Sequence, residues 1–260
     1  MEVLANLMEV PKYSFSKLNS FKGCKYGYKL TYVDKQRGEG HGFSDLGSFV
    51  HGILEDYLNE EIAQFEMISK FDDEFEENVP NGVELKISKT FSRDLTDSYK
   101  TQCKTFLSKF DGFPEHSVLG VEEKFEILVK IKDKMLILNG FIDTVIQDNH
   151  GDITIIDYKS KSAFKNKAEL KEYARQLYMY SIWIKYKYGK YPKNLQFVQF
   201  RIDHVENIIF NLEDFNETLE WIFDTSEEIE YEEMFDPSCD EFFANNLCGH
   251  SKYCPYAKLY

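Results

Sequence analysis

The sequence predicts a mixed α/β fold, an α+β mixed sheet with flanking helices. Two observations carry this prediction. Segments with helical and strand periodicity follow one another along all 260 residues, and the 14 Gly and 6 Pro leave no obvious interdomain linker. A hydrophobic content of 43% is enough for a core and excludes a disordered chain. We therefore expect one domain over residues 1–260, in which residues 201–260 form an acidic helix and a cysteine-bearing C-terminal segment.

The expected elements follow from hydrophobic periodicity and turn residues. Phe49, Val50 and Ile53 have the spacing of one helix face, whereas the segment after Val118 alternates as strands do. In chain order we expect helices at 46–65 and 96–110, strands within 118–138 that turn near 132–134, strands at 140–146 and 153–158 joined by the turn-rich 147–152, a helix at 168–188, a strand at 194–203, and an acidic amphipathic helix at 212–231.

The net charge of −14 is unevenly distributed, and this distribution decides whether nucleic-acid binding is excluded. Residues 201–260 hold 15 acidic and 3 basic residues, whereas residues 156–193 hold 10 basic and 3 acidic ones. Phosphate contacts need Lys and Arg, and the basic stretch can supply them. The acidity therefore excludes uniform coating of DNA, but it does not exclude a nucleic-acid enzyme.

Targeting signals and disulfide patterns are not evident. The chain has no apolar run of 18 residues, and its start lacks the charged and apolar regions of a secretory signal. An odd count of 5 Cys in a chain of this size favours reduced thiols or metal ligands over disulfides. These features predict a cytoplasmic protein without a membrane partner.

Two carboxylates and a lysine form the main candidate for chemistry. Side chains alternate along a strand, so Asp157 and Lys159 point to one face, and Asp143 joins them if it lies on the neighbouring strand. Carboxylates on rigid strands suit Mg²⁺ or Mn²⁺, which can polarise a phosphodiester and activate water. Lys159 would stabilise developing negative charge. A surface hairpin with a salt bridge is the competing interpretation.

Helical residues on either side of these strands extend the candidate site. Gln176 and Tyr180 are four residues apart and share a helix face, from which Gln176 could bond a phosphate, a base or Lys159. His51 lies early on its own predicted helix, with Glu55 close to its face. Each of these residues is also compatible with an ordinary helix surface.

The ordered set of motifs resembles the RecB-like nucleases of the PD-(D/E)xK superfamily, which include nuclease modules of recombination helicase–nucleases, CRISPR-associated adaptation nucleases and phage exonucleases. The resemblance runs from Ser14 to Cys254. The motifs that carry it lie at 14–18, 21, 24–28, 47–51, 121–125, 140–143, 157–159 and 176–180. It implies a restriction-endonuclease-like core.

The resemblance also implies roles for individual residues. His51, Asp143 and Asp157 would be metal ligands, with Tyr158 lending its backbone carbonyl. Lys159 would be the catalytic lysine. The glutamine–tyrosine motif of the family would be Gln176 and Tyr180, also catalytic. A frequent family glutamate would be Glu122, as a second-shell or second-metal group, or its neighbour Glu123.

The cysteines suggest a second metal site. A subset of RecB-like nucleases holds a [4Fe–4S] cluster with one cysteine before the core and three after it, which here would be Cys24, Cys239, Cys248 and Cys254. Cys248 and Cys254 have the family spacing, but Cys239 lies farther upstream than the family pattern has it, so His250 could replace it. Zinc is the alternative metal, and free thiols are the interpretation without a metal. Cys103, within a predicted helix, is expected to be a small buried hydrophobe.

Basic residues near the candidate site suggest a path for DNA. Lys161, Lys165, Lys167 and Arg175 alternate with aromatic residues that could stack on unpaired bases. A solvated helix face is the competing interpretation.

Together these features predict a metal-dependent deoxyribonuclease, an exonuclease that acts on single-stranded DNA ends in recombination, repair, phage DNA processing or CRISPR adaptation. A helicase, recombination or integrase protein would be its partner, in a bacterial, archaeal or phage-infected cell. A non-catalytic DNA-end or partner-binding subunit and a zinc-stabilised interaction module are the alternatives.

Overall fold

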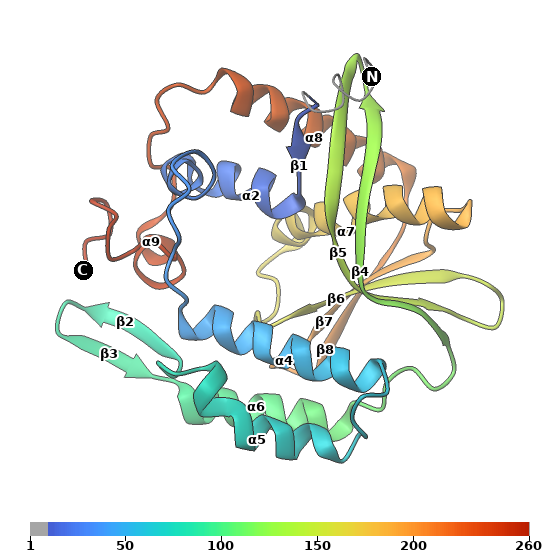
Figure 1. The fold of residues 1–260 in the computed structure, drawn as a ribbon, viewed down its shortest axis with the longest axis horizontal. Coiled ribbons are helices and arrows are strands. Elements are labelled where there is room, and N and C mark those ends of the chain that lie inside the picture. The colour runs from blue at the N-terminus through green and yellow to red at the C-terminus, as the bar shows by residue number, and fades with distance from the viewer. Residues whose placement is uncertain (1–9, 260) are drawn as a thin grey trace, which may run out of the picture.

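The computed structural model describes residues 10–259, and its centre is a 6-stranded mixed sheet with helices on both faces (Figure 1). The strands are β1 (Lys12–Tyr13), β4 (Ser117–Ile131), β5 (Lys134–Gln147), β6 (Ile153–Lys159), β7 (Asn194–Gln199) and β8 (His204–Ile209). Their order is β1-β5-β6-β7-β8, with β4 also paired to β5. The β1–β5 and β6–β7 pairs are parallel and the others are antiparallel. The predicted mixed α/β fold is confirmed.

Helices α2 (Phe15–Gly23), α7 (Lys167–Tyr188) and α8 (Leu212–Tyr231) share one hydrophobic core with the sheet. In this core Leu177 of α7 and Ile222 of α8 are fully buried with Ile155 of β6. Burial of this apolar surface is the main free-energy gain that holds helices and sheet together.

A second core lies between the sheet and helices α4 (Gly42–Leu58), α5 (Glu66–Asn78) and α6 (Thr96–Lys109). Ile53, Phe71 and Leu107, one from each helix, are fully buried there with Ile156 of β6. Ile155 and Ile156 thus enter opposite cores, as expected for a central strand covered on both faces.

Helix α4 carries one of the predicted site residues, and its start is fixed by a capping box. The His41 side chain accepts a hydrogen bond from the Ser44 backbone N–H, and the Ser44 hydroxyl accepts one from the His41 backbone N–H. This pairing satisfies two N–H groups that a helix start leaves free. Apolar residues at helical spacing then turn one face of α4 into the second core.

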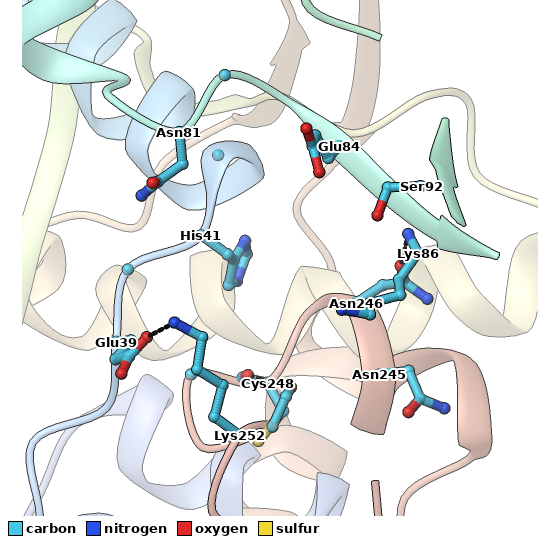
Figure 2. Close-up of a pocket in the computed structure, with 15 residues that line it drawn as sticks. Glu39, His41, Asn81, Glu84, Lys86, Ser92, Asn245, Asn246, Cys248 and Lys252 are labelled. Atoms are coloured by element: carbon cyan, nitrogen blue, oxygen red, sulfur yellow. Dashed lines mark hydrogen bonds and ion pairs between the residues drawn. The ribbon is translucent and has the colours of Figure 1, made fainter. Parts of the chain in front are cut away.

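Smaller elements surround the sheet. They are α3 (Lys25–Tyr28), a π-helix η1 (Lys29–Val33), a hairpin of β2 (Glu84–Ser88) and β3 (Phe91–Asp94), and α9 (Glu241–Asn246). The hairpin, α9 and the segment after it line a pocket of about 260 Å³ together with the approach to α4 (Figure 2). Within residues 10–259, no helix combines the length and hydropathy that crossing a bilayer requires.

Several boundaries differ from the sequence-based expectation. The helix expected at 46–65 runs from Gly42 to Leu58, and the strand expected at 194–203 ends at Gln199, before a turn into β8. Strands expected on either side of position 139 form the single strand β5. Helix α5 and the β2–β3 hairpin were not expected. Met67, Phe71 and Phe75 follow one face of α5 at helical spacing, so this helix has a local signal that the sequence-based expectation left out. The two strands of the hairpin are short and mostly exposed, and they carry little such signal.

Candidate functional site

The two aspartates meet where β5 and β6 run side by side. Thr144 pairs with Ile156 in the antiparallel ladder, so Asp143 and Asp157 stand at the next facing position. Asp143 Oδ2 accepts a hydrogen bond of 2.8 Å from the Tyr158 backbone N–H. The sheet therefore brings the two carboxylates together without help from a loop.

His51 reaches this pair from α4. Its Nδ1 lies 3.5 Å from Asp143 Oδ2, and its Nε2 lies 2.8 Å from the Tyr158 carbonyl oxygen. A carbonyl only accepts hydrogen bonds, so Nε2 carries the proton and Nδ1 keeps a lone pair directed at Asp143. Burial lowers the pKa of His51, although Asp157 acts in the opposite direction. Neutral imidazole is the form that binds metals.

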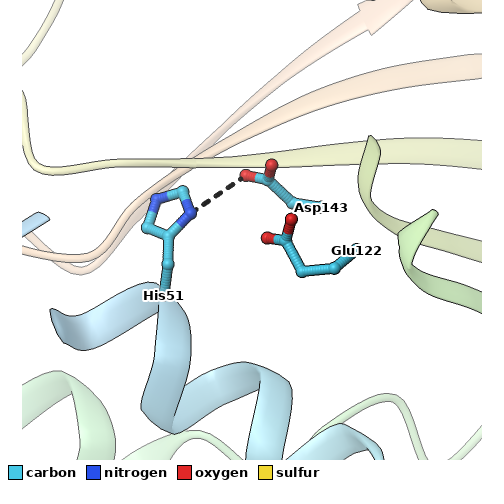
Figure 3. Close-up of side chains that lie close together, drawn as sticks. All are labelled: His51, Glu122 and Asp143. Atoms are coloured by element: carbon cyan, nitrogen blue, oxygen red, sulfur yellow. Dashed lines mark ion pairs between the residues drawn. The ribbon is translucent and has the colours of Figure 1, made fainter. Parts of the chain in front are cut away.

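Glu122 completes a compact group of metal-ligand side chains. One ligand atom from each of His51, Glu122 and Asp143 lies within 4.8 Å of the others (Figure 3). Glu122 stands opposite Asp143 on β4 with a left-handed φ of 45°, which few non-glycine residues adopt. Such strain persists where the surrounding structure enforces it, often at functional sites.

The charges in this group are incompletely compensated. Burial raises the pKa of Asp143 well above its ordinary value, and nearby Asp157 raises it further. Burial raises the pKa of Glu122 as well, with added repulsion from Glu55 and Asp157. A cation placed among these carboxylates would offset both effects.

Asp157 and Lys159 form the innermost part of the site. Asp157 is 1% exposed, and its Oδ2 lies 2.7 Å from Lys159 Nζ. That ion pair is not aligned as a hydrogen bond, so within residues 10–259 this buried oxygen has no hydrogen-bond donor. A divalent cation fits the donor set, because it would use the orphaned oxygen of Asp157 together with the Nδ1 lone pair of His51.

A chain of hydrogen bonds holds Lys159 from the α7 side. Lys159 Nζ donates to Gln176 Oε1 at 2.9 Å, and Gln176 Nε2 donates to the Tyr180 hydroxyl at 2.7 Å. Tyr180 is 6% exposed, so the amide and ammonium are supported by a fixed ring. The i,i+4 spacing on α7 thus places both residues beside Lys159, as expected from the sequence.

The site opens into a groove of about 510 Å³ between α4 and the sheet. Its lining includes His51, Glu122, Tyr158 and Lys159, together with Glu55 one turn after His51. The sequence placed Glu55 near the face of His51 but gave it no role. Only the approach of β4 to α4 brings Glu55 into the same groove as Glu122.

Glu123, the alternative to Glu122, lies on the other face of β4. Its carboxylate accepts hydrogen bonds from Trp183 Nε1 at 2.5 Å and from Lys187 Nζ at 2.7 Å, both on α7. Glu122 is therefore the one of the two that faces His51 and Asp143.

Two of the four basic residues expected to bind DNA have intramolecular partners. Lys161 pairs with Glu169 at 2.9 Å, and the Arg175 guanidinium lies 5.1 Å from the Trp221 ring centroid, where burial lowers its pKa. Lys165 and Lys167 are exposed at the start of α7. Their roles in DNA binding remain predictions.

The cysteines come together from both ends of the chain. Burial alone raises the pKa of Cys24, but hydrogen bonds from the backbone of Gly27 and Ser238 and from Cys239 outweigh it and lower the pKa. Burial and the nearby Cys24 raise the pKa of Cys239 to about 12, and Cys248 lies close enough to add to this.

Burial raises the pKa of the Cys248 thiol, and the nearby Cys24 and Cys254 raise it further. Over residues 10–259, however, the group with ligand atoms within 4.8 Å of one another is His51, Glu122 and Asp143, and the cysteines do not form such a group. Cys103 is fully buried in the second core, as expected for a small hydrophobe.

His250 lies beside the cysteines and is 5% exposed. Its Nε2 lies 2.9 Å from the Thr31 hydroxyl, and its buried Nδ1 has no hydrogen-bond partner among the described residues. Asn246 of α9 binds the Lys86 backbone N–H at 2.6 Å, and Gly249 accepts a hydrogen bond of 2.7 Å from the Glu39 backbone N–H. The cysteine segment therefore touches the linker that leads into α4.

Comparison with known proteins identifies a family for nearly the whole chain. The model of the PD-(D/E)XK nuclease superfamily matches residues 12–259. No curated protein matches the chain. Among solved structures, the chain is similar to one titled "Crystal structure of SSO0001", with 14% identity over 92% of this chain and 94% of that chain and a TM-score of 0.37.

Proposed function

The chain belongs to the PD-(D/E)XK nuclease superfamily, and from this we propose that it is a divalent-metal-dependent deoxyribonuclease that removes nucleotides from single-stranded DNA ends. The observation that carries the proposal is the grouping of His51, Glu122 and Asp143 beside Lys159. A metal-ligand set next to a held ammonium is what phosphodiester hydrolysis requires.

The residues divide into ligands and groups that act on the phosphate. His51, Asp143, Asp157 and the Tyr158 carbonyl would hold Mg²⁺ or Mn²⁺. When bound, such an ion supplies Lewis-acid polarisation and a more acidic water. Lys159 binds a non-bridging phosphate oxygen or orients the attacking water.

Gln176 positions the Lys159 ammonium through a hydrogen bond, and the Tyr180 hydroxyl accepts a hydrogen bond from the Gln176 amide and so holds it in place. Because Gln176 accepts from Lys159 without carrying a charge, it leaves the positive charge of the ammonium available to the phosphate. Glu122 lies at the groove side of the ligands, where it would bind a second cation or a metal-bound water.

The test is cleavage of end-labelled single-stranded DNA with Mg²⁺ or Mn²⁺, compared with matched duplex and RNA. Wild type should release short products, and EDTA should stop the reaction. Lys159→Ala should lower kcat by at least 100-fold, because one electrostatic donor to a transition state typically contributes that much. Lys193→Ala is the matched control, since Lys193 pairs with Asp152 on the surface.

Absence of cleavage by wild type, or full activity of Lys159→Ala, would contradict the proposal. Tight DNA binding with no turnover would instead identify a non-catalytic DNA-end-binding subunit. Product length and the choice of labelled end distinguish exonuclease from endonuclease behaviour and give the polarity.

The RecB-like pattern suggests recombination, repair, phage DNA processing or CRISPR adaptation as the setting, with a helicase or integrase as partner. We also propose that Cys24, Cys239, Cys248 and Cys254 hold a [4Fe–4S] cluster, with zinc as the alternative. The proposal is supported by the proximity of these thiols, because each of Cys24, Cys239 and Cys248 has its pKa shifted in part by another of the four. Together they join segments from both ends of the chain.

Anaerobic purification followed by metal analysis and absorbance spectroscopy tests the cysteine site. A broad visible band with iron and sulfide indicates the cluster, whereas a colourless protein with one zinc indicates the alternative. His250→Ala should matter only in the zinc case, where the unpartnered Nδ1 would be a ligand. Absence of both metals from protein purified without chelator would contradict a metal at these cysteines.

A further inference from the structure

Phe141 is an exposed aromatic residue beside the nuclease site. It lies on β5 two residues before Asp143, and it is 52% exposed. It belongs to neither hydrophobic core, and within residues 10–259 its ring makes no aromatic contact. About half of its surface stays in water, so Phe141 contributes less to folding than a buried phenylalanine does.

The side chain of Phe141 leaves the same face of β5 as Asp143. A Cβ on Gly140 would meet the rings of Phe125 and Tyr180, and Ile142 is fully buried in the core shared with α7. Residues 140 and 142 therefore face α7, so residues 141 and 143 point the other way, to the face of the hairpin that also carries Glu122. Two strand residues span about 7 Å, so the ring lies close to the proposed ligands.

Lys124 stands next to Phe141 across the β4–β5 hairpin, whose arms run side by side in Figure 1. Paired residues on neighbouring strands share a face, and Lys124 is exposed. Within the described chain its ammonium has no hydrogen bond or ion pair, unlike those of Lys171 and Lys187. Glu126, on the same face of β4, is already paired with Lys12.

We propose that Phe141 and Lys124 form a stacking subsite, in which the Phe141 ring holds the unpaired base next to the scissile phosphate and Lys124 binds the neighbouring phosphate. This inference rests on the proposed nuclease function. Every base has a π-face, so a stacking platform tolerates any sequence but requires an unstacked base. A duplex keeps its bases stacked, and the subsite therefore selects single strands.

The position and charge of the Phe141–Lys124 subsite indicate which ligand it binds. The patch is continuous with the proposed metal ligands through Asp143, and its charged member, Lys124, has no ion-pair partner among residues 10–259. Both features fit a polyanionic strand that already has one phosphate at the metal ligands.

The experiment measures affinity for a fluorescent single-stranded oligonucleotide by anisotropy, with every protein carrying Lys159→Ala so that the DNA stays intact. Phe141→Ala and Phe141→Leu should each weaken binding about 10-fold, as loss of one base stack does. Phe141→Trp should bind as well as the parent. Phe91→Ala is the matched control, because Phe91 is 60% exposed on the distant β2–β3 hairpin.

An abasic scan of the oligonucleotide separates stacking from a structural effect. One abasic position should weaken binding to the parent about 10-fold and add nothing when Phe141 is already Ala, since both changes remove the same contact. Equal binding by the parent and Phe141→Ala, or full additivity of the two changes, would overturn the subsite. A parent that is a dimer by light scattering and becomes monomeric in Phe141→Ala would overturn it in favour of a second copy of the chain.

The two proposals fail separately. If wild type cleaves DNA and Phe141→Ala has the same affinity and the same preference for single strands, only the subsite is wrong. If wild type neither binds nor cleaves DNA, the proposed function is wrong as well.

Discussion

Individual side chains of the site constrain one another's charge. Asp143 is held beside Asp157 in a buried position, and its pKa is raised by that burial and by its neighbour. Lys159 supplies the nearby positive charge but is itself bonded to Gln176. The metal-free site is therefore strained electrostatically, and three predictions belong to this scale.

Replacing Asp143 by Asn should raise the Tm of the metal-free protein, and by more at pH 8 than at pH 5. The folded pKa is raised above the unfolded value, so the unfolded state ionises first as pH rises and the cost of keeping the group folded grows until the folded pKa is passed. Each ~1 kcal/mol relieved corresponds to about 2 °C in a chain of this size. Calorimetry with EDTA across pH checks this.

Mn²⁺ should reverse the order of the two Tm values, so that wild type becomes more stable than Asp143→Asn. The ion needs the Asp143 carboxylate deprotonated, so it should stabilise wild type more at pH 8 than at pH 5 and stabilise Asp143→Asn little. An equal Mn²⁺ response of wild type and variant would show that Asp143 is not a ligand.

Gln176 and Tyr180 should affect kcat in a graded way. Gln176→Ala removes the bond to Lys159 and should lower kcat about 10-fold, whereas Tyr180→Phe removes only the support behind it and should cost about 5-fold or less. Metal affinity should stay constant in both, because neither touches the carboxylates. Gln196→Ala, whose amide bonds Asn207 on β7–β8, is the control. A change in metal affinity with kcat intact would contradict the positioning role.

Among the elements, α4 connects the site to the rest of the molecule. It carries His51 on one face and its apolar residues on the other, and the approach to it passes the cysteine segment and the β2–β3 hairpin (Figure 2). Its first residue is packed against the turn before β2. A Cβ on Gly42 would lie 1.7 Å from the Gly82 carbonyl oxygen.

Two glycines of α4 should respond oppositely to the same substitution. Gly42→Ala should destabilise the protein by more than about 2 kcal/mol, since backbone must move to admit the methyl group. Gly52→Ala should stabilise it by about 1 kcal/mol, because a Cβ there meets nothing within 4 Å and alanine favours the helix. Urea denaturation measures both. A neutral Gly42→Ala would show that this contact is loose.

For the whole molecule, the charge of −14 is compatible with DNA binding because it is unevenly distributed, and the pairing of charges decides which lysines are left to bind DNA. The C-terminal acids lie largely on α8, where Asp214 and Glu217 bind Lys171 and Glu227 binds Lys134. Many lysines of the basic stretch are therefore already neutralised. The lysines that remain exposed at the start of α7 are the ones expected to add to DNA affinity.

The salt dependence of DNA binding should identify those lysines. Lys165→Ala and Lys167→Ala should each reduce the slope of log affinity against log salt by about 0.7, the value for one phosphate contact on single strands. Lys171→Ala should leave the slope unchanged, because Asp214 and Glu217 already hold its ammonium. Binding isotherms over a salt series check this. A reduced slope for Lys171→Ala would place the DNA path over α7–α8 instead.

We propose that the chain acts as one nuclease domain, with the cysteine segment joining its two ends. The segment meets the approach to α4 through the Glu39 and Gly249 backbones and through the ion pair of Lys252 with Glu39. Loss of a metal from the cysteines would therefore loosen the contacts that hold the start of α4, the helix that carries His51.

The sequence by itself determined the mixed fold, the central strands and helices α6, α7 and α8, because hydrophobic periodicity is a local signal. It also selected Asp143, Asp157, Lys159, Gln176 and Tyr180, since strand alternation and the i,i+4 helix rule place side chains before any packing is known.

Only the tertiary structure decided the rest, because convergence of distant segments depends on packing. It placed Glu122 beside His51 and Asp143 and bound Glu123 to α7, and it brought Glu55 into the groove. It also gave Lys161 and Arg175 intramolecular partners, and in the part of the chain that the structure describes it left Lys124 without one. Pairing of charges between elements is a long-range property, and no local pattern records it.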